Sequence, residues 1–237
     1  MLTADSLEKD LRAVASRGKD DIAVLERFFK TGKGGYAEGD LFIGVTVPTN
    51  RTICKKYLAM PLPQIEQALD NPIHEMRLAA VMIMSYQSQA SGTAEALKKA
   101  LFDLYLRRTD RINNWDIVDA SCRFVVGDYL LDKSRKVLYS LARSKDIWER
   151  RIAMVSTFAF IREGQLNDTF KLAEMLLGDK HDLIHKAVGW MLREAGKRDH
   201  AKLEQFLDEH SKQMPRTTLR YAIEHFSPVV RQEYLKK

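Results

Sequence analysis

The 237 residues are 45% hydrophobic and carry a formal net charge of +6, from 38 Lys and Arg against 32 Asp and Glu. This apolar content argues against a disordered chain and allows a sizeable core, while six prolines and twelve glycines are few for the turns of an all-β protein. The positive charge suits a polyanionic partner such as nucleic acid.

The first residues and the cysteines bear on where the protein works. Residues 1–14 have the pattern of a capped amphipathic helix with acidic side chains, which differs from a signal peptide. No apolar run approaches the roughly 18 residues that a membrane span needs. Cys54 and Cys122 lie far apart in apolar helical patterns, as buried, reduced thiols do. We therefore expect a cytoplasmic protein that does not enter a membrane.

Helical periodicity runs through nearly the whole chain, and most of its breaks fall at Gly, Pro, Asn or Asp. Pro63 falls in the first turn of one segment, where its missing N–H costs nothing. Because the connections are short, neighbouring helices are expected to pack antiparallel. In chain order, the predicted helices are Thr3–Ala15, Asp21–Phe29, Asn50–Leu58, Pro63–Leu69, Ile73–Gln89, Thr93–Arg107, Asn114–Leu131, Ser134–Arg143, Ile147–Glu163, Asn167–Leu177, Leu183–Ala195, Ala201–His210 and Arg216–His225.

One irregular stretch, Thr31–Pro48, separates the second predicted helix from the third. Its glycines predict a loop with backbone angles that other residues rarely adopt. It lacks the Lys-Ser/Thr of a phosphate-binding loop, and apolar extended chain follows it instead of a helix. Its apolar end, Leu41–Val47, is expected to tuck under the first helices.

An internal repeat begins at Ile73, Ile112, Ile147 and Ile184, so a copy starts every 35 to 39 residues. This period is typical of stacked helix pairs. The sequence therefore predicts an all-α fold, a right-handed solenoid of HEAT-like antiparallel helix pairs that forms a single domain over residues 1–237. Apolar residues recur at offsets 0, 5 and 8 in most copies and mark the packed face. Offsets 3, 4 and 7 are predicted to line a concave, basic surface.

That predicted surface gathers residues that a plain scaffold does not need. Trp115 and Asp119 are four residues apart and share one face of a helix. The third copy adds Arg150 and Arg151, whose planar donors suit phosphate. The fourth copy adds Trp190, and an indole offers its π face to sugars, bases and cations. These five residues are candidates for chemistry on a nucleic acid.

Each of these residue types also has a structural interpretation. A tryptophan in a helical repeat is often part of the core, and neighbouring arginines often make salt bridges within a repeat. Asp119 alone could be a surface carboxylate. Asp116 follows Asn113 by three residues, so it could serve only to start its helix. A functional interpretation is favoured only because these residues are predicted to lie on the same side of the repeated helices.

Further basic residues extend the candidate surface, whereas metal chemistry finds little support. Lys186, Arg193 and Lys197 are spaced by seven and four residues and form one stripe on one helix. His181 and His185 are four apart, but they lack the glutamate of an HExxH site. We therefore expect neither a metal nor a cofactor.

Three motifs, taken together, resemble a known family: Trp115-Asp-Ile-Val-Asp119, Ile147-Trp-Glu-Arg-Arg151 and Lys186-Ala-Val-Gly-Trp-Met-Leu-Arg-Glu194. They are similar, in matching order, to the DNA alkylation-repair glycosylases of the AlkD type. Residues 35–45 resemble the N-terminal loop of that family, and the similarity runs from about residue 20 to residue 225.

The resemblance implies a monofunctional glycosylase that removes cationic N3- or N7-alkylated purines from double-stranded DNA and leaves an abasic site. It implies a catalytic carboxylate at Asp119, flanked by Trp115 and Trp190, without a cofactor. We expect a monomer. The predicted DNA-binding residues are Tyr36, Arg150, Arg151, Lys186, Arg193 and Lys197.

Two alternatives remain open at the level of sequence. The first is a binder of damaged or branched DNA that uses the same scaffold without catalysis, as some relatives in this family do. The second is a HEAT-type protein–protein scaffold, which predicts that Trp115 and Trp190 lie in the core and that DNA affinity does not depend on salt.

Overall fold

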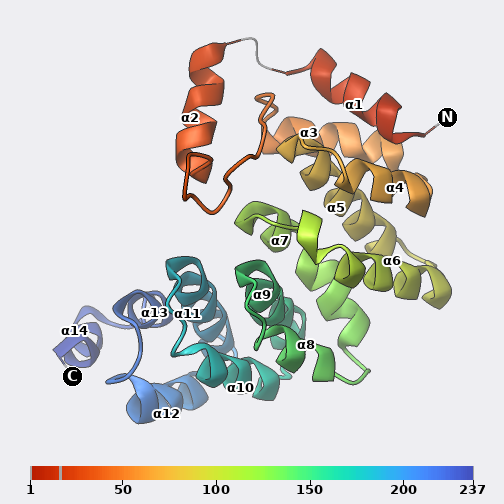
Figure 1. Cartoon of the computed structure of the whole chain (residues 1–237). Helices are drawn as coiled ribbons and strands as arrows, with labels where there is room; N and C mark the ends of the chain where they lie inside the picture. Colours follow the sequence, from red (N-terminus) through yellow and green to blue (C-terminus); the bar gives the residue numbers. More distant parts are fainter. Residues whose placement is uncertain (1, 16–17, 237) are drawn as a thin grey trace. The chain divides into compact units, whose positions relative to one another are not determined.

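The computed structural model describes residues 2–15 and 18–236, which fold almost entirely into helices (Figure 1). The chain divides into two compact units, Met1–Val125 and Val126–Lys237. Within the described ranges the β pairing is limited to an isolated bridge between Leu41 and Ile73. The predicted all-α class is therefore confirmed. The single domain, the solenoid with its right-handed sense and concave basic surface, and the monomer stay predictions.

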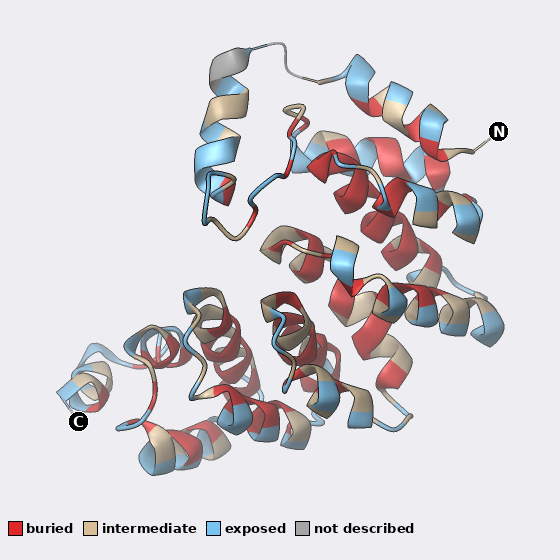
Figure 2. Cartoon of the chain, in the orientation of Figure 1, coloured by how far each residue is buried: buried red, intermediate tan, exposed pale blue. Residues whose placement is uncertain are grey.

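The first unit is built around one central helix. Its helices are α1 (Ala4–Ala13), α2 (Lys19–Phe29), α3 (Val47–Cys54), α4 (Leu62–Leu69), α5 (His74–Gln89), α6 (Glu95–Arg107) and α7 (Trp115–Cys122), with 3₁₀ turns at Lys55–Tyr57 and Thr109–Arg111. Helix α5 contacts α1, α3, α4, α6 and α7. It is buried on nearly every side (Figure 2), as a helix surrounded by neighbours must be.

The second unit continues with pairs of helices. Its helices are α8 (Lys136–Leu141), α9 (Ile147–Arg162), α10 (Asn167–Leu176), α11 (Asp182–Gly196), α12 (His200–His210), α13 (Arg216–Ala222) and α14 (Pro228–Lys236), preceded by a 3₁₀ turn at Asp128–Leu130. Helix α11 packs against α9, α10, α12 and α13. None of the helices in the described part of the chain has the length and apolar character to cross a membrane.

The prediction that offsets 3, 4 and 7 of each repeat face an open surface was wrong in the first copy. Met76, Arg77 and Ala80 are all buried, because helices pack around α5 on several sides. In the third copy, likewise, Met154 is buried. In the fourth copy the same holds for Ala187, Val188 and Met191. In these three copies the apolar residues at offsets 3, 4 and 7 therefore belong to the core.

The long helix predicted at Asn114–Leu131 is divided into three pieces. Helix α7 ends at Cys122, a π turn covers Arg123–Gly127, and the 3₁₀ turn follows. The carbonyl oxygen of Phe124 accepts a hydrogen bond from the Ser88 hydroxyl at 3.0 Å, so the irregular turn does not leave it unsatisfied. A Cβ at Gly127 would lie 2.4 Å from the Ser156 carbonyl oxygen, which shows how closely this segment approaches α9.

The predicted loop between α2 and α3 is confirmed. Gly34, Gly39 and Gly44 have φ angles of 79°, 87° and 77°, in the left-handed region that glycine favours. The side chains of Phe42 and Val45 are buried under the first helices, as predicted, whereas Leu41 is 53% exposed. Helix α3 begins at Val47, earlier than predicted, and Thr46 caps it through a hydrogen bond from the Thr49 N–H.

The prediction that both cysteines are buried is confirmed, and they form no disulfide with each other. Burial raises the pKa of the Cys54 thiol to about 12, so this thiol is protonated at neutral pH and is a weak nucleophile. Neither cysteine therefore competes with the residues considered below as a source of chemistry.

Candidate functional site

The start of α7 determines where Trp115 and Asp119 lie. Buried Asn114 caps this helix, because its side-chain oxygen accepts a hydrogen bond from the Trp115 N–H at 2.8 Å. One oxygen of Asp116 accepts from the Ile117 N–H at 2.8 Å, and its negative charge favours the N-terminal end of a helix. The capping residue of α7 is therefore Asn114 and not Asn113, the residue that the sequence had paired with Asp116.

Trp115 completes an aromatic cluster that also includes α2 and the loop. Its indole stacks on Phe29, with ring centroids 5.4 Å apart and an interplanar angle of 14°, and meets Phe28 edge-on at 5.8 Å. Phe29 stacks in turn on Phe42 at 4.9 Å. Phe29, Ala37 and Phe42 form the buried part of this cluster, whereas the indole of Trp115 is partly exposed. The ring is thus held in place and still open to a ligand.

Asp119 lies one turn along α7 from Trp115 and is also partly exposed. Residues four apart on a helix lie one above the other on the same face. The predicted pairing of an indole with a carboxylate therefore exists on this helix. Its catalytic role stays a prediction.

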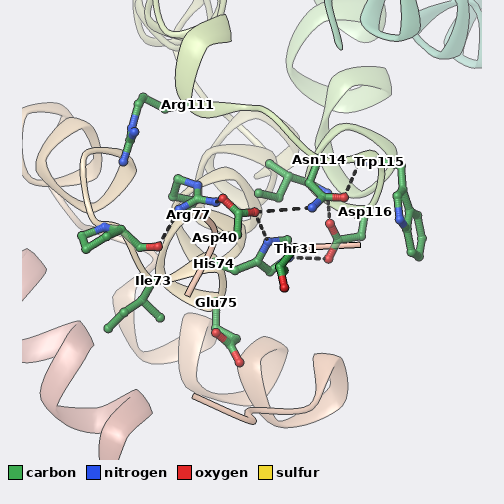
Figure 3. Close-up of polar contacts among 12 residues, drawn as sticks. Thr31, Asp40, Ile73, His74, Glu75, Arg77, Arg111, Asn114, Trp115 and Asp116 are labelled. Atoms are coloured by element: carbon green, nitrogen blue, oxygen red, sulfur yellow. Dashed lines mark hydrogen bonds and ion pairs between the residues drawn. The ribbon is translucent and has the colours of Figure 1, made fainter. Parts of the chain in front are cut away.

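A buried network of charges lies behind this face (Figure 3). The two ring nitrogens of His74 each meet a carboxylate: Nδ1 lies 3.2 Å from Asp40 Oδ2, and Nε2 lies 2.8 Å from Asp116 Oδ2. The Arg77 guanidinium donates to the other oxygen of Asp40 at 2.6 Å. Since these side chains are 2% to 11% exposed, hardly any of their charge is screened by water.

The pKa values in this network follow from its charges. Burial alone lowers the pKa of His74, but its hydrogen bonds to Asp116 and Asp40 and the charge of Asp116 raise it to about 9. Burial raises the pKa of Asp40, yet the hydrogen bond from His74 and the charge of Arg77 bring it below its ordinary value. At neutral pH the network thus holds two carboxylates and two cations, which balance.

The first turn of α5 also holds the loop in place. The Glu75 carboxylate accepts hydrogen bonds from the N–H groups of Ile43, Gly44 and Val45 at 3.1, 2.8 and 3.2 Å. The His74 N–H donates to the Leu41 carbonyl at 2.8 Å. Because charge-assisted hydrogen bonds are the strong ones, this contact fixes the backbone of the loop that carries Phe42.

The predicted DNA-binding residue Tyr36 lies in the same loop and packs against the same aromatic cluster as Trp115. Its hydroxyl donates to the Phe28 carbonyl at 3.4 Å, and the Lys30 ammonium lies 5.7 Å from the centre of its ring. The structure therefore brings Tyr36 and Trp115 to one aromatic cluster within the first unit. The DNA contact of Tyr36 stays a prediction.

The roles of Asp40, His74 and Arg77 were not predicted from the sequence. A signal was present, because His74, Glu75 and Arg77 are charged or polar residues at the start of a helix whose remainder is apolar. Charged side chains are rarely fully buried unless they are paired. Their partners lie in a loop more than thirty residues away, which no local pattern identifies.

In the second unit, both arginines of the third repeat make structural contacts. Arg151 is 5% exposed, and its guanidinium donates to the Leu183 carbonyl at 2.5 Å. Arg150 forms an ion pair with Asp179 at 2.6 Å and donates to the Ser144 carbonyl at 2.9 Å. These contacts tie the start of α9 to the segment that leads into α11. The predicted role of both arginines in DNA binding is not tested by them.

The basic stripe on α11 is accompanied by acidic partners. Lys186 pairs with Asp182 and Lys197 pairs with Glu194, each at 2.8 Å, and Arg193 forms an ion pair with Glu224. Both lysines lie about half exposed on the surface, where such pairs are weak and exchange readily. The stripe is therefore available to a phosphate at little cost.

Trp190 lies on the same helix and is partly exposed, with its ring 6.0 Å from that of Phe158. By contrast, Trp148 is 6% exposed and belongs to the core. The scaffold alternative predicted that both Trp115 and Trp190 are core residues, and the structure places neither in the core. Trp190 and Asp119 belong to different units, and the flanking of Asp119 by Trp190 stays a prediction.

Neither His181 nor His185 resembles a metal ligand in this structure. His181 caps α11 by accepting the Leu183 N–H at 3.2 Å, and His185 lies 2.6 Å from the Asp179 carbonyl. Across residues 2–15 and 18–236, no three His, Cys, Asp or Glu side chains gather in a way that could hold a metal ion.

Comparison with known proteins gives these features a context. A family model described as "DNA alkylation repair enzyme" matches residues 7–226, nearly the whole chain. The chain belongs to the DNA alkylation repair enzyme family. For a member of this family the substrate is DNA, and the partly exposed face of α7 lies within the matched region.

A solved structure agrees with this family membership at the level of the fold. It is described as "Predicted DNA alkylation repair enzyme from Enterococcus faecalis", with a TM-score of 0.67 and 17% sequence identity over 90% of this chain and 98% of the other. At this identity the likeness shows the shared helical fold alone. No curated protein matches the chain significantly.

Proposed function

We propose that this DNA alkylation repair enzyme is a glycosylase that hydrolyses the N-glycosidic bond of cationic N3- or N7-alkylated purines and leaves an abasic site. The observation that carries the proposal is the face of α7, where a partly exposed indole and a carboxylate lie one turn apart. Family membership over residues 7–226 supports the choice of alkylated DNA as substrate.

The chemistry of the substrate explains why these groups would suffice. Alkylation at N3 or N7 gives the purine a positive charge, so it leaves without strong protonation. As the bond to the sugar C1′ lengthens, positive charge develops on the sugar, as in other glycoside cleavages. A carboxylate at Asp119 would stabilise this charge and orient the attacking water. The reaction therefore requires neither a metal nor a cofactor.

The indoles would act by cation–π attraction and by shape. A cation above an indole face gains roughly 0.5–2 kcal/mol, depending on how far the site is desolvated. In this proposal Trp115 contacts the sugar from α7, and Trp190 contacts it from α11. Arg150, Arg151 and the stripe on α11 would hold the phosphates, as would Tyr36 from the loop. Without a nucleophilic lysine in this set, the strand would stay intact.

The decisive test compares the parental protein with Asp119→Asn. The variant keeps the size and most hydrogen bonds of the side chain but loses its charge. We expect single-turnover excision of 7-methylguanine from a duplex to slow by about 10²–10³, by analogy with the loss of one preorganised electrostatic contact. Affinity for undamaged duplex and the melting temperature should hardly change, since a partly exposed carboxylate contributes little stability and repels phosphate.

A matched control is Asp103→Asn on α6. This carboxylate is exposed and pairs only with Lys99 on its own helix, so its loss should leave excision unchanged. If Asp119→Asn excises at the parental rate, Asp119 is not the catalytic carboxylate. If the parental protein binds DNA well and excises no cationic adduct, the non-catalytic DNA binder is the correct alternative.

A further inference from the structure

His74 joins three elements of the first unit. Its backbone starts α5, its Nδ1 meets Asp40 of the loop, and its Nε2 meets Asp116 in the first turn of α7. Figure 3 shows these side chains converging on one imidazole from separate segments of the chain. Since Asp116 follows Trp115 in the sequence, the hydrogen bond to Asp116 fixes the turn of helix that carries this indole.

A second route connects His74 to the same indole through stacked rings. The imidazole stacks on Phe42, with centroids 4.5 Å apart and an interplanar angle of 23°, and lies 5.0 Å from Phe29. Phe29 stacks on Trp115. His74 therefore reaches Trp115 both by hydrogen bonding through Asp116 and by packing through Phe29.

The geometry requires a charged ring. Each ring nitrogen faces a carboxylate oxygen, and a carboxylate only accepts hydrogen bonds. A neutral imidazole has a single N–H, so one of its nitrogens would point a lone pair at a carboxylate. The charged groups that face the ring are Asp40 from the loop, Asp116 from α7 and Arg77 from α5 itself. Only an imidazolium satisfies both carboxylates and balances the network.

We propose that His74, as an imidazolium, is a positioning residue for base excision that holds the first turn of α7 so that Trp115 and Asp119 present one ordered face to the DNA. The part that concerns excision rests on the proposed function. The part that concerns Trp115 does not, because it can be measured without substrate. His74 itself is buried and touches no substrate in this proposal.

The first test measures the surroundings of Trp115 directly. The protein is labelled with 5-fluorotryptophan, and its three resonances, from Trp115, Trp148 and Trp190, are assigned by single Trp→Phe variants and followed by ¹⁹F NMR as the pH rises. We expect the Trp115 resonance to titrate with a midpoint of about 9, together with His74. The Trp148 and Trp190 resonances serve as internal references. In His74→Gln the Trp115 resonance should be displaced at neutral pH, and it should no longer titrate with a midpoint of about 9.

A milder variant guards against loss of folding. Asp116→Asn keeps an acceptor for the Nε2–H of His74 but removes one of the two negative charges, so the midpoint of the Trp115 titration should fall by about one pH unit or more. The matched control is His225→Gln, which alters an exposed histidine in the second unit and should leave the Trp115 titration unchanged. If His74→Gln does not fold, the positioning role is tested by comparing the Trp115 titration of Asp116→Asn with that of the parental protein.

The second test measures excision at saturating enzyme. We expect His74→Gln to lower the single-turnover rate constant about tenfold while its affinity for undamaged duplex changes less than twofold, because a displaced indole affects the reacting sugar more than the phosphates. If the contacts of His74 served stability alone, His74→Gln would lower the melting temperature and leave the single-turnover rate constant of the folded protein unchanged.

The two tests separate the two hypotheses. A Trp115 resonance that is identical in His74→Gln and in the parental protein across the pH range overturns the positioning role, whether or not the enzyme excises. So does a folded His74→Gln variant that excises at the parental rate. If the Trp115 resonance depends on His74 but the parental protein excises no adduct, His74 positions Trp115 as proposed and the proposed function is overturned.

Discussion

Charged side chains that are buried near the start of α5 stabilise the fold only as a complete set. Removing one member of a buried ion pair is costly, because its partner keeps its charge without compensation. Arg77 illustrates this, since it holds Asp40 and also donates to the carbonyls of Asn71 and Pro72 at 3.1 and 3.0 Å. His74 loses its positive charge as the pH rises through about 9.

Stability should therefore depend on the protonation of His74. Folding raises its pKa from 6.5 to about 9, so this contribution is complete below pH 6.5 and is lost as the pH rises through about 9. The shift corresponds to on the order of 3 kcal/mol. We expect urea unfolding to show a difference in free energy between the parental protein and His74→Gln that is largest near pH 6 and shrinks towards pH 10. The control His225→Gln should show no such trend, and a difference that grows with pH would contradict the assignment.

At the same scale, the sequence could predict residues that act through helical spacing. Trp115 and Asp119 lie four apart, so their shared face followed from the helix alone. Asp40, His74 and Asp116 lie in three separate segments, and their contacts arise only when those segments pack. The sequence also could not reveal that Arg151 donates to the Leu183 carbonyl, since that contact joins two helical repeats.

Helix starts and the close approach of helices govern the fold at the scale of elements. Some starts were predictable from a capping residue before an apolar pattern, as at α9, where Asp146 accepts the Trp148 N–H at 2.6 Å. The start of α3 was not, although Thr46 caps it. The π turn at Arg123–Gly127 was not predictable, because the residues that accommodate it lie in neighbouring helices. Helix α14 was missed because its polar sequence buries little beyond Tyr234.

Gly189 provides a test of helix packing in the second unit. Alanine normally stabilises the middle of a helix relative to glycine. Here a Cβ would lie 2.6 Å from the Thr218 carbonyl oxygen and 2.5 Å from the Tyr221 Cβ, so α13 would have to move away from α11. We expect Gly189→Ala to destabilise the protein by about 1–3 kcal/mol in urea unfolding. The control Gly178→Ala, where a Cβ would meet nothing within 4 Å, should have little effect. A stabilising Gly189→Ala would show that the two helices are not in close contact.

At the scale of the whole molecule, the positive charge is only partly available to a ligand. The chain has a net charge of +6, yet many of its cations are paired within their own unit. Arg150 pairs with Asp179, whose side chain is 7% exposed, whereas the pairs of Lys186 and Lys197 are solvent-exposed. An exposed pair contributes little, so a DNA phosphate can replace the acidic partner at small cost. The lysines of α11 are therefore better candidates for reversible phosphate contacts than the two arginines of α9.

This difference leads to an expectation for DNA binding by the whole protein. Each phosphate neutralised by a lysine or arginine releases counterions, so the logarithm of the association constant should fall linearly with the logarithm of the salt concentration. We expect Lys186→Gln and Lys197→Gln each to weaken binding of undamaged duplex similarly for all sequences and to reduce the magnitude of that slope by about one. The control Lys171→Gln, on an exposed position of α10, should leave the slope unchanged. Fluorescence anisotropy over a range of salt concentrations measures all four proteins. If the parental protein shows a flat salt response, DNA is not held through its phosphates, and the predicted role of the basic stripe on α11 is wrong.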